Sequence, residues 1–284
     1  MTSREIAARL GLRRVRPAEW RGTCPACGYV AACVLSEGRD GAPLLWCACC
    51  RDRKAMGAVL RGEGYQHPAQ RDRIPARSSG QREAWARAMW QRGQAAAGTV
   101  VDRYLAARGL APVTGGALRY LPADRHTESG HVGPVMLAAA CDVAGTIRAT
   151  HRTWLQPDGA GKASVDPPRK TLGHPLGCAV RLMPAIDEVV LAEGLETALS
   201  ASVLFGLPAW ACLSAGGLEA VRLPETIRDV VIAADRDVHG EGERAAETLA
   251  MRLAREGRAV RIALPNTPGT DFNDFLIERS KRHV

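Results

Sequence analysis

The C-terminal third of the chain alternates short apolar runs with amphipathic stretches. From residue 186 onward, four runs are apolar at almost every position, which is typical of strands buried on both faces: EVVLAEG, PAWACLS, DVVIAAD and AVRIALP. Three stretches with helical periodicity separate or follow them: LETALSASVLFG, GERAAETLAMRLAREG and FNDFLIERS. The pattern predicts an α/β domain over residues 186–284, in which helices flank a parallel sheet.

The rest of the chain is less regular and predicts two further parts. Residues 1–64 begin with a short amphipathic helix and carry six of the nine cysteines. Residues 65–82 are polar, contain Pro, Ser and Gly, and are typical of a linker. A helical pattern starts at Glu83, a second helix is predicted before Gly109, and short strands and turns follow. We therefore expect an α+β subdomain over residues 83–185.

Two C-x₂-C pairs stand 19 residues apart in the N-terminal part: Cys24 with Cys27, and Cys47 with Cys50. Each pair forms a turn that presents two thiolates, and two pairs at this spacing are a strong signal for tetrahedral Zn²⁺. Strands over residues 29–35 and 43–46 would connect the two turns. The sequence therefore predicts a small structural zinc ribbon with these four ligands.

The remaining cysteines leave one question open and help to place the protein. Cys49 could replace either neighbouring ligand, and Cys33 has no assigned role. Three others lie in apolar stretches, which is typical of inert core thiols: Cys141, Cys178 and Cys212. The N-terminus lacks the apolar segment of a secretory signal, and the longest apolar run is too short to span a membrane. We expect a cytoplasmic protein with reduced thiols and no membrane partner.

Acidic residues gather where the predicted strands end: Glu193, Asp235, Asp237, Asp271 and Asp274. The carboxyl ends of parallel strands meet at one edge of a sheet, where ligands of such folds bind. An Asp-x-Asp pair lets two carboxylates reach one hard cation such as Mg²⁺ or Mn²⁺, and a nearby Glu can add a ligand or act as acid or base. Each acid could instead cap the helix that follows it. Their convergence at three strand ends favours the metal site.

The positive charge of the chain lies in its first third. Residues 1–100 hold 17 Lys and Arg against 8 Asp and Glu, whereas the rest holds 21 against 22. This asymmetry favours contact between the first third and a polyanion, although a solvated Arg-rich surface would look the same. Arg51 and Lys54, which follow the second cysteine pair, are candidates for such contact.

At Glu193-Gly194 and Asp235-x-Asp237 the sequence resembles a Toprim domain, the fold shared by bacterial-type primases, topoisomerases and some nucleases. The wider pattern is similar to primase-like Toprim proteins of phages, plasmids and integrative elements: LAEGLETALS, LSAGGL, IAADRDVHG and DFNDFL. CPACG with WCACC resembles the zinc module of such primases. The middle segment looks like the same family at YLAARGL, HRTWL, GKASVDPPRKTLG and GCAVRL, so the resemblance covers nearly the whole chain.

The resemblance implies a role for each matched residue. Glu193 would act as acid, base or metal ligand, and Asp235 and Asp237 would bind Mg²⁺ or Mn²⁺. Asp271 and Asp274 match the distal acidic motif. Arg169 and Lys170 resemble a primase segment that holds the single-stranded DNA template or a nucleoside triphosphate. Two further candidates come from the residues themselves: Lys162, in a polar hairpin turn, for contact with nucleic acid, and Arg152 for contact with phosphate, although Arg152 could equally belong to a strand with ordinary packing. Two positions depart from the primase pattern, because Thr197 stands where an Asp is usual and Thr270 where a Lys is frequent.

These features predict a primase-like nucleotidyltransferase that makes short primers on single-stranded DNA. GAGKAS lacks the spacing of a phosphate-binding loop, so no helicase motor is expected, and a helicase partner would be separately encoded. Two alternatives stay open. One is a non-catalytic DNA-binding accessory to a helicase or primase of a mobile element, and the other is a Toprim nuclease that needs no nucleoside triphosphate.

Overall fold

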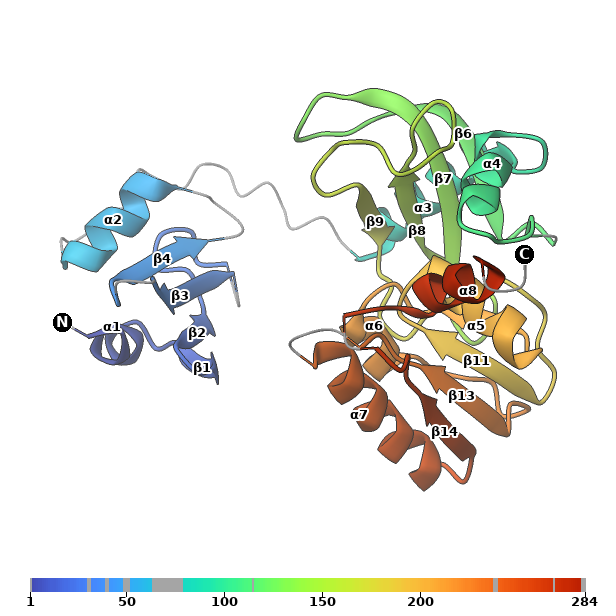
Figure 1. Cartoon of the computed structure of the whole chain (residues 1–284). Coiled ribbons are helices and arrows are strands. Elements are labelled where there is room, and N and C mark those ends of the chain that lie inside the picture. Colours follow the sequence, from blue (N-terminus) through green and yellow to red (C-terminus); the bar gives the residue numbers. More distant parts are fainter. Residues whose placement is uncertain are drawn as a thin grey trace. The chain divides into compact units, whose positions relative to one another are not determined.

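The computed structural model describes residues 2–29, 32–38, 41–47, 52–62, 79–113, 115–236, 240–267 and 269–281 (Figure 1). The chain divides into two compact units, Met1–Ala76 and Arg77–Val284. Within the described ranges, no helix combines the length and apolar character that crossing a membrane requires.

The N-terminal unit is a four-stranded antiparallel sheet with two helices, in the sheet order β1-β2-β3-β4. Its elements are α1 (Ser3–Arg9), β1 (Arg13–Arg16), β2 (Glu19–Gly22), β3 (Cys33–Glu37), β4 (Pro43–Cys47) and α2 (Arg53–Arg61). A reciprocal capping box between Thr2 and Glu5 starts α1. Both strands expected in the ribbon are present, with the first shifted towards higher numbers. The β1-β2 pair was not predicted, because its arginine-rich sequence carries no apolar alternation.

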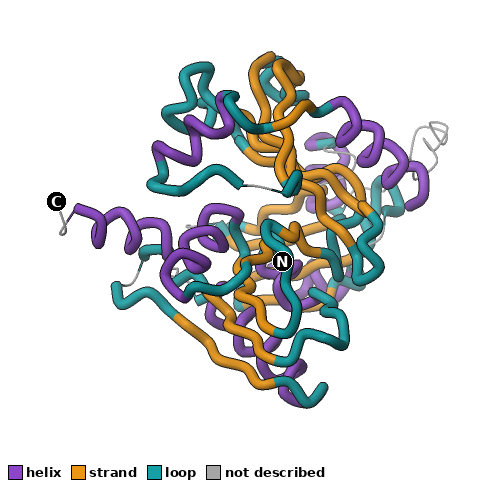
Figure 2. The backbone as a smooth tube through the Cα atoms, turned by 90° about the vertical axis from the view of Figure 1, so that its right-hand side faces the viewer, coloured by secondary structure: helices purple, strands orange, loops and turns teal. Residues whose placement is uncertain are grey.

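The second unit is built on one mixed sheet of ten strands. Its first elements are α3 (Ser79–Arg92), β5 (Gln94–Ala95), α4 (Val100–Ala107), β6 (Leu118–Arg125), β7 (Val132–Cys141), β8 (Ile147–Trp154), β9 (Arg169–Gly173) and β10 (Ala179–Arg181). The rest are β11 (Glu188–Ala192), α5 (Leu195–Phe205), β12 (Ala209–Ala211), α6 (Ala215–Ala220), β13 (Asp229–Ala233), α7 (Glu241–Arg255), β14 (Ala259–Ala263) and α8 (Phe272–Lys281). Figure 2 traces these strands in orange and the helices in purple.

The sheet changes character part-way along its order, β14-β13-β11-β12-β10-β7-β6-β5. The four strands from β14 to β12 are parallel, which confirms the expected α/β part. β10 is antiparallel to β12 on one side and to β7 on the other, and thereby joins the parallel strands to the antiparallel ones. Helix α3 begins at Ser79, four residues before the helical pattern was expected to start, and residues 65–78 of the expected linker lie outside the described residues.

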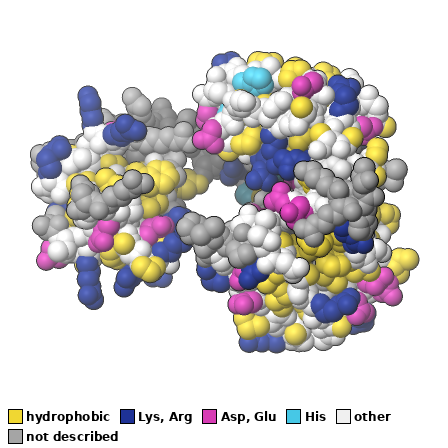
Figure 3. Space-filling view, viewed as in Figure 1, with side chains coloured by type: hydrophobic (Ala, Val, Ile, Leu, Met, Phe, Trp, Pro, Cys, Tyr) yellow, Lys and Arg dark blue, Asp and Glu magenta, His cyan; other side chains and the backbone are white. Residues whose placement is uncertain are grey.

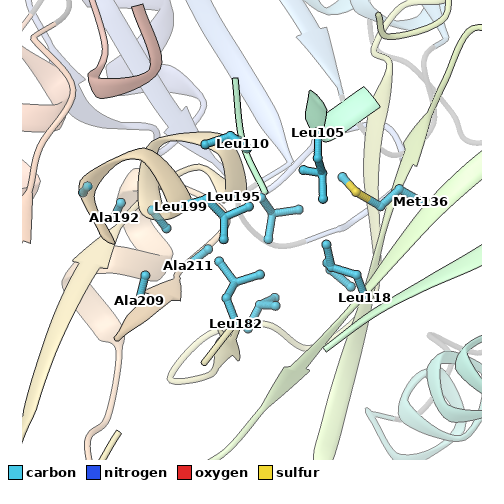
Figure 4. Packing of buried hydrophobic residues seen from close by; sticks show 14 of the residues in the cluster. Leu105, Leu110, Leu118, Met136, Leu182, Ala192, Leu195, Leu199, Ala209 and Ala211 are labelled. Carbon is cyan, nitrogen blue, oxygen red and sulfur yellow. The ribbon is translucent and has the colours of Figure 1, made fainter. Parts of the chain in front are cut away.

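One hydrophobic core serves both halves of this unit. Leu105 of α4, Leu118 of β6 and Met136 of β7 belong to the same buried cluster as Leu195 and Leu199 of α5 (Figure 4). A second cluster lies between the parallel strands and the helices α6 and α7. The middle segment and the α/β segment therefore share apolar surface that neither could bury alone.

Two glycines let helices approach the ends of the parallel strands. A Cβ atom at Gly242, in the first turn of α7, would lie 2.5 Å from the carbonyl oxygen of Asp235. A Cβ atom at Gly217, in α6, would lie 2.0 Å from the carbonyl oxygen of Cys212. Close approach at these two points fixes the backbone around the edge where the strands end.

We predict that residues 77–284 fold as one cooperative unit and that residues 186–284 alone do not. Cutting before residue 186 exposes the apolar faces of Leu195 and Leu199, which pack against the middle segment. Thermal unfolding followed by circular dichroism should give one sharp transition for the longer fragment and none for the shorter one. A sharp transition of residues 186–284 alone would contradict the shared core.

Candidate functional site

Three of the expected acids line one cavity of about 190 Å³ in the second unit. Glu193 directly follows β11 and Asp235 lies two residues beyond β13, two neighbouring parallel strands that end in register at Ala192 and Ala233. Asp271 comes directly before α8. Asp237 lies outside the described residues. The strand ends thus bring Glu193 and Asp235 to one edge of the sheet, where the sequence expects them.

The two distal acids also cap α8. The backbone N–H of Asp271 donates to Oδ2 of Asp274 at 3.2 Å, and the backbone N–H of Asp274 donates to Oδ1 of Asp271 at 2.9 Å. This reciprocal arrangement satisfies two N–H groups at the start of the helix. Asp271 faces the cavity as well, whereas Asp274 is exposed and is not among the residues that line it. Asp274 therefore acts as a helix cap, the alternative role considered for these acids, and not as part of the cavity lining.

Thr197 stands beside Asp235 in the cavity. Its hydroxyl donates to Oδ1 of Asp235 at 3.3 Å, and the residue is 3% exposed. The hydroxyl contributes a hydrogen bond where the primase pattern has a carboxylate, so the cavity wall carries one negative charge fewer. Gly194 lies between Glu193 and α5, and a Cβ atom there would come within 3.3 Å of the Thr197 hydroxyl oxygen.

Three cationic side chains line the same cavity as these acids. Arg108 comes from the C-terminal end of α4, Lys162 from the hairpin that follows β8, and Arg169 from the first position of β9. In the described part of the chain, the Arg169 side chain forms no hydrogen bond or ion pair within the protein. Figure 3 shows Lys and Arg side chains gathered next to acidic ones on this unit. The cavity therefore combines the two charges that a cation and a phosphate group require.

The pairing of β8 with β9 separates the other basic candidates from the cavity. Arg152 pairs with Lys170 and Thr153 with Arg169, and successive side chains of a strand point to opposite faces. Arg152 forms an ion pair with Asp124 at 3.0 Å, and Lys170 one with Glu128. Neither lines the cavity. Lys54 is exposed on α2 of the other unit, and Arg51 lies outside the described residues.

A buried carboxylate that the sequence analysis missed holds Lys162. Glu196 is 6% exposed, its Oε1 lies 2.9 Å from Nζ of Lys162, and it accepts a hydrogen bond from the Tyr104 hydroxyl. Burial alone would raise the pKa of Glu196, but the charge of Lys162 and the hydrogen bonds from Tyr104 and Lys162 outweigh it and lower the pKa to about 2. Glu196 is therefore ionised at neutral pH.

Burial also sets the protonation of the cavity's neutral groups. It lowers the pKa of His151 to about 4, with the charge of Arg169 acting in the same direction, so this imidazole is neutral. Its Nδ1 lies 2.8 Å from the hydroxyl oxygen of Thr171. Burial, helped by Glu196, raises the pKa of the Tyr104 hydroxyl. Tyr104 therefore remains a hydrogen-bond donor and is unsuited to act as a nucleophile.

Asn273 ties three helices together beside the cavity. Its Nδ2 donates to the carbonyl oxygen of Arg108 at 2.9 Å and to the hydroxyl of Ser200 at 3.0 Å. Its Oδ1 accepts a hydrogen bond from the Arg108 guanidinium at 3.3 Å. Asn273 has no exposed surface. Arg108 is thus oriented by α8, a helix 165 residues away along the chain.

Sequence reasoning missed several residues of this site: Tyr104, Arg108, Glu196, Leu213 and Asn273. Leu213 lines the cavity with φ of 71°, a value rare for a side chain of this kind, and its N–H donates to the carbonyl of Glu193 at 2.8 Å. The local sequence gives no sign of this strain. The sequence signal was an acid, Glu196, within the largely apolar helical stretch LETALSASVLFG, because a helix seldom buries an acid without a partner.

The first unit holds a cysteine cluster suited to a metal. The sulfur atoms of Cys24, Cys27 and Cys47 lie within 4.8 Å of one another, and those of Cys27 and Cys47 are 3.7 Å apart. A tetrahedral Zn²⁺ with Zn–S bonds of about 2.3 Å separates its sulfurs by about 3.8 Å, so the three residues fit this ion. Cys50, the expected fourth ligand, and its neighbour Cys49 lie outside the described residues.

Cys33 is fully buried opposite Cys47 and belongs to the core of this unit. In the second unit, burial raises the pKa of Cys178 to about 11 and that of Cys212 to about 12, so both thiols stay protonated. Burial also raises the pKa of Cys141. These values agree with inert thiols.

The acids suit a cation that takes few protein ligands. Within the described residues, Glu193, Asp235 and Asp271 do not come as close together as the three cysteines do. Mg²⁺ characteristically takes one or two carboxylates and fills its other positions with water or phosphate oxygens. Glu193 and Asp235 fit such a site, with the cations opposite them available for phosphate.

Residues 188–282 match the family model of the Toprim domain. This part of the chain is a Toprim domain. Toprim domains bind divalent metals. Residues 80–182 match a second family, described as a domain of unknown function (DUF7146). Among curated proteins, no match to the chain was found.

Three solved structures illustrate what the Toprim-containing chain is similar to. A DNA primase domain from Pseudomonas aeruginosa has 15% identity and a TM-score of 0.44, over 71% of this chain and 77% of that one. The zinc-binding and RNA polymerase domains of Aquifex aeolicus primase have 14% identity and a TM-score of 0.49, over 100% of this chain and 81% of that one. The primase fragment of the bacteriophage T7 primase-helicase protein has 17% identity and a TM-score of 0.47, over 92% of this chain and 96% of that one.

We predict a pH dependence of stability that originates at His151. The folded protein keeps this imidazole neutral down to about pH 4, whereas the unfolded chain binds the proton near its ordinary pKa of 6.5. The free energy of unfolding should therefore fall as pH decreases from about 6.5 to about 4, by about 3 kcal/mol. Urea unfolding at several pH values should show this slope, and His151→Asn, which can keep the contact to Thr171, should reduce it. Glu196 should cause a separate decrease in the free energy of unfolding as pH falls from about 4.5 to about 2, because its pKa is lower in the folded protein. An unchanged slope in His151→Asn would exclude this origin.

We also predict that the protein contains about one Zn²⁺ per chain. Cys24→Ser removes a thiolate from the cluster and should release the metal and unfold the N-terminal unit, because a unit of this size depends on its metal. Metal analysis and thermal unfolding should show zinc loss without a change in the transition of the second unit. Cys212→Ser, a buried thiol of the second unit, is the control and should retain zinc.

Proposed function

We propose that the protein is a primase-like nucleotidyltransferase that makes short primers on single-stranded DNA from nucleoside triphosphates, with Mg²⁺ or Mn²⁺. The observation that carries the proposal is the cavity of the Toprim-containing unit. There, the strand-end carboxylates of Glu193 and Asp235 face the cations of Arg108, Lys162 and Arg169. Acids facing bases across a small polar cavity suit a reaction in which both a metal ion and phosphate groups must bind.

Each side chain has a distinct task in this reaction. Asp235, with Asp237, would hold the divalent cation, which when bound supplies charge neutralisation at the transferring phosphoryl group. Glu193 would add a ligand or accept the proton of the attacking 3′-hydroxyl. Lys162 and Arg169 would bind the phosphates of the incoming nucleotide. Arg108, held by Asn273, would bind phosphate from the α4 side of the cavity.

Nothing in this chemistry needs a covalent intermediate with the protein. Tyr104 is fully buried, its hydroxyl donates to Glu196, and its raised pKa keeps it protonated. This protonated state argues against a topoisomerase-like attack on DNA by Tyr104.

We propose that the N-terminal unit contacts the single-stranded template. Tyr29, in the segment between β2 and β3, and Trp46 of β4 are exposed, at 50% and 51%, and the first 100 residues carry the excess of positive charge. Exposed rings and cations are the usual means of binding single strands. A separately encoded helicase would open the duplex for this protein.

We predict that Asp235→Asn and Glu193→Gln each lower nucleotide incorporation on single-stranded DNA by about 100-fold or more, because each removes charge that holds the metal or moves the proton. Labelled-nucleotide incorporation measures this effect, and thermal unfolding should show an intact fold. Asp274→Asn should be milder, since this residue is exposed and caps α8. The matched control is Asp229→Asn, at the first position of β13, the strand after which Asp235 follows.

The same assay separates the alternatives. DNA cleavage without nucleoside triphosphates, lost in Asp235→Asn, would identify a nuclease. Binding of DNA with neither incorporation nor cleavage under Mg²⁺ or Mn²⁺ would identify a non-catalytic accessory and overturn the proposal.

A further inference from the structure

The Toprim motif accounts for Glu193, Gly194 and Asp235 but leaves the most buried acid of the cavity without a role. Glu196 has only 6% exposed surface and forms its contacts with Lys162 and Tyr104, two residues from other segments of the chain. Burying an ionised carboxylate costs several kcal/mol unless partners compensate it. An acid kept in this position, beside a cavity lined with cations, requires an explanation.

The hairpin that carries Lys162 is seated on α4. A Cβ atom at Gly159 would lie 2.7 Å from Cβ of Arg103 and 3.0 Å from the carbonyl oxygen of Val100, so the hairpin backbone touches the helix. Gly159 has φ of 82°. Nε of Arg103 donates to the carbonyl of Asp158 at 3.0 Å. These contacts fix the backbone that leads to Lys162.

The tip of the lysine side chain is fixed by Glu196. Lys162 is only partly exposed, at 21% of its side chain, and Glu196 is its only ion-pair partner in the part of the chain described by the structure. Holding a free lysine in one rotamer costs conformational entropy, and the ion pair offsets this cost before a ligand arrives. An ammonium has three N–H donors. One points to Glu196, and among the described residues no other side chain pairs with the ammonium, which leaves donors for a ligand.

We propose that Glu196 is a positioning residue that, together with Tyr104, holds the Lys162 ammonium at the cavity wall to bind the phosphate groups of a nucleoside triphosphate. This inference rests on the proposed function. Tyr104 fixes the carboxylate, the carboxylate fixes the ammonium, and the ammonium meets the substrate. Glu196 itself does not touch the substrate.

The charges of this pair make the role measurable. Lys162 and Glu196 together are neutral, so the lysine contributes orientation rather than net charge to the cavity. Glu196→Gln adds one net positive charge and frees the ammonium. Anion affinity should then hold or rise, because an anion no longer competes with the carboxylate, while catalysis should fall because the phosphates are no longer aligned.

The experiment compares Glu196→Gln, Lys162→Met and the double variant in the full-length protein. Calorimetry with inorganic tripolyphosphate measures anion binding, and steady-state incorporation measures kcat and KM. For Glu196→Gln we expect equal or tighter tripolyphosphate binding, an unchanged or lower KM, and kcat about 10-fold lower. Lys162→Met should weaken tripolyphosphate binding about 10-fold. The double variant should have the same tripolyphosphate affinity and kcat as Lys162→Met, since Glu196 acts through the lysine.

A matched ion pair controls for the loss of a salt bridge as such. Glu83 and Arg148 are 2.9 Å apart in the same unit and do not line the cavity. Glu83→Gln and Arg148→Met should leave tripolyphosphate affinity, kcat and KM unchanged. If Glu196→Gln does not fold, Tyr104→Phe takes its place, because it removes only the hydroxyl that orients Glu196. It should lower kcat several-fold at unchanged tripolyphosphate affinity.

Three results would overturn the inference: weaker tripolyphosphate binding in Glu196→Gln, an unchanged kcat in that variant or in Tyr104→Phe, or additive losses in the double variant. A wild-type protein that incorporates no nucleotide would refute the proposed function instead. The binding measurements would then still decide whether Glu196 acts through Lys162.

Discussion

Val180 lies between Ala140 of β7 and Ala211 of β12, so the short strand β10 joins the antiparallel and parallel parts of one sheet. Val180 is completely buried. Because of this connection, the Toprim domain and the segment before it share a sheet as well as a core. The cavity depends on both, since its acids follow parallel strands while its cations come from α4, the hairpin after β8 and β9.

Charge in the cavity is arranged in two layers. The outer layer consists of groups that can meet a ligand, among them Asp235 and Arg169. The inner layer consists of Glu196 and Tyr104, which hold Lys162, a member of the outer layer, before any ligand binds. Such a preorganised arrangement has little reorganisation left to do when a polyanion enters. It also explains how a buried acid can be ionised, because burial would raise the pKa of Glu196 but its neighbours Lys162 and Tyr104 lower it.

The parallel strands and two of the acids could be predicted because both follow from local pattern: continuous apolar runs, two of which end at an acidic residue, Glu193 or Asp235. Glu193 and Asp235 accordingly line the same cavity. The basic side could be predicted only in part. Which of Arg169 and Lys170 faces the cavity depends on the pairing of β8 with β9, and a shift of one residue would exchange them. Arg108 and Glu196 depend on contacts between segments far apart in sequence, which no local pattern encodes.

Asn273 has consequences for how this site can change over evolutionary time. Its amide donates to a backbone carbonyl and a hydroxyl while its oxygen accepts from Arg108. An aspartate of the same size would lose both donors, and a leucine would remove all three hydrogen bonds. Drift at position 273 therefore requires simultaneous change at positions 108 and 200. The cationic wall on the α4 side and the C-terminal helix can be expected to evolve together, as one inherited module.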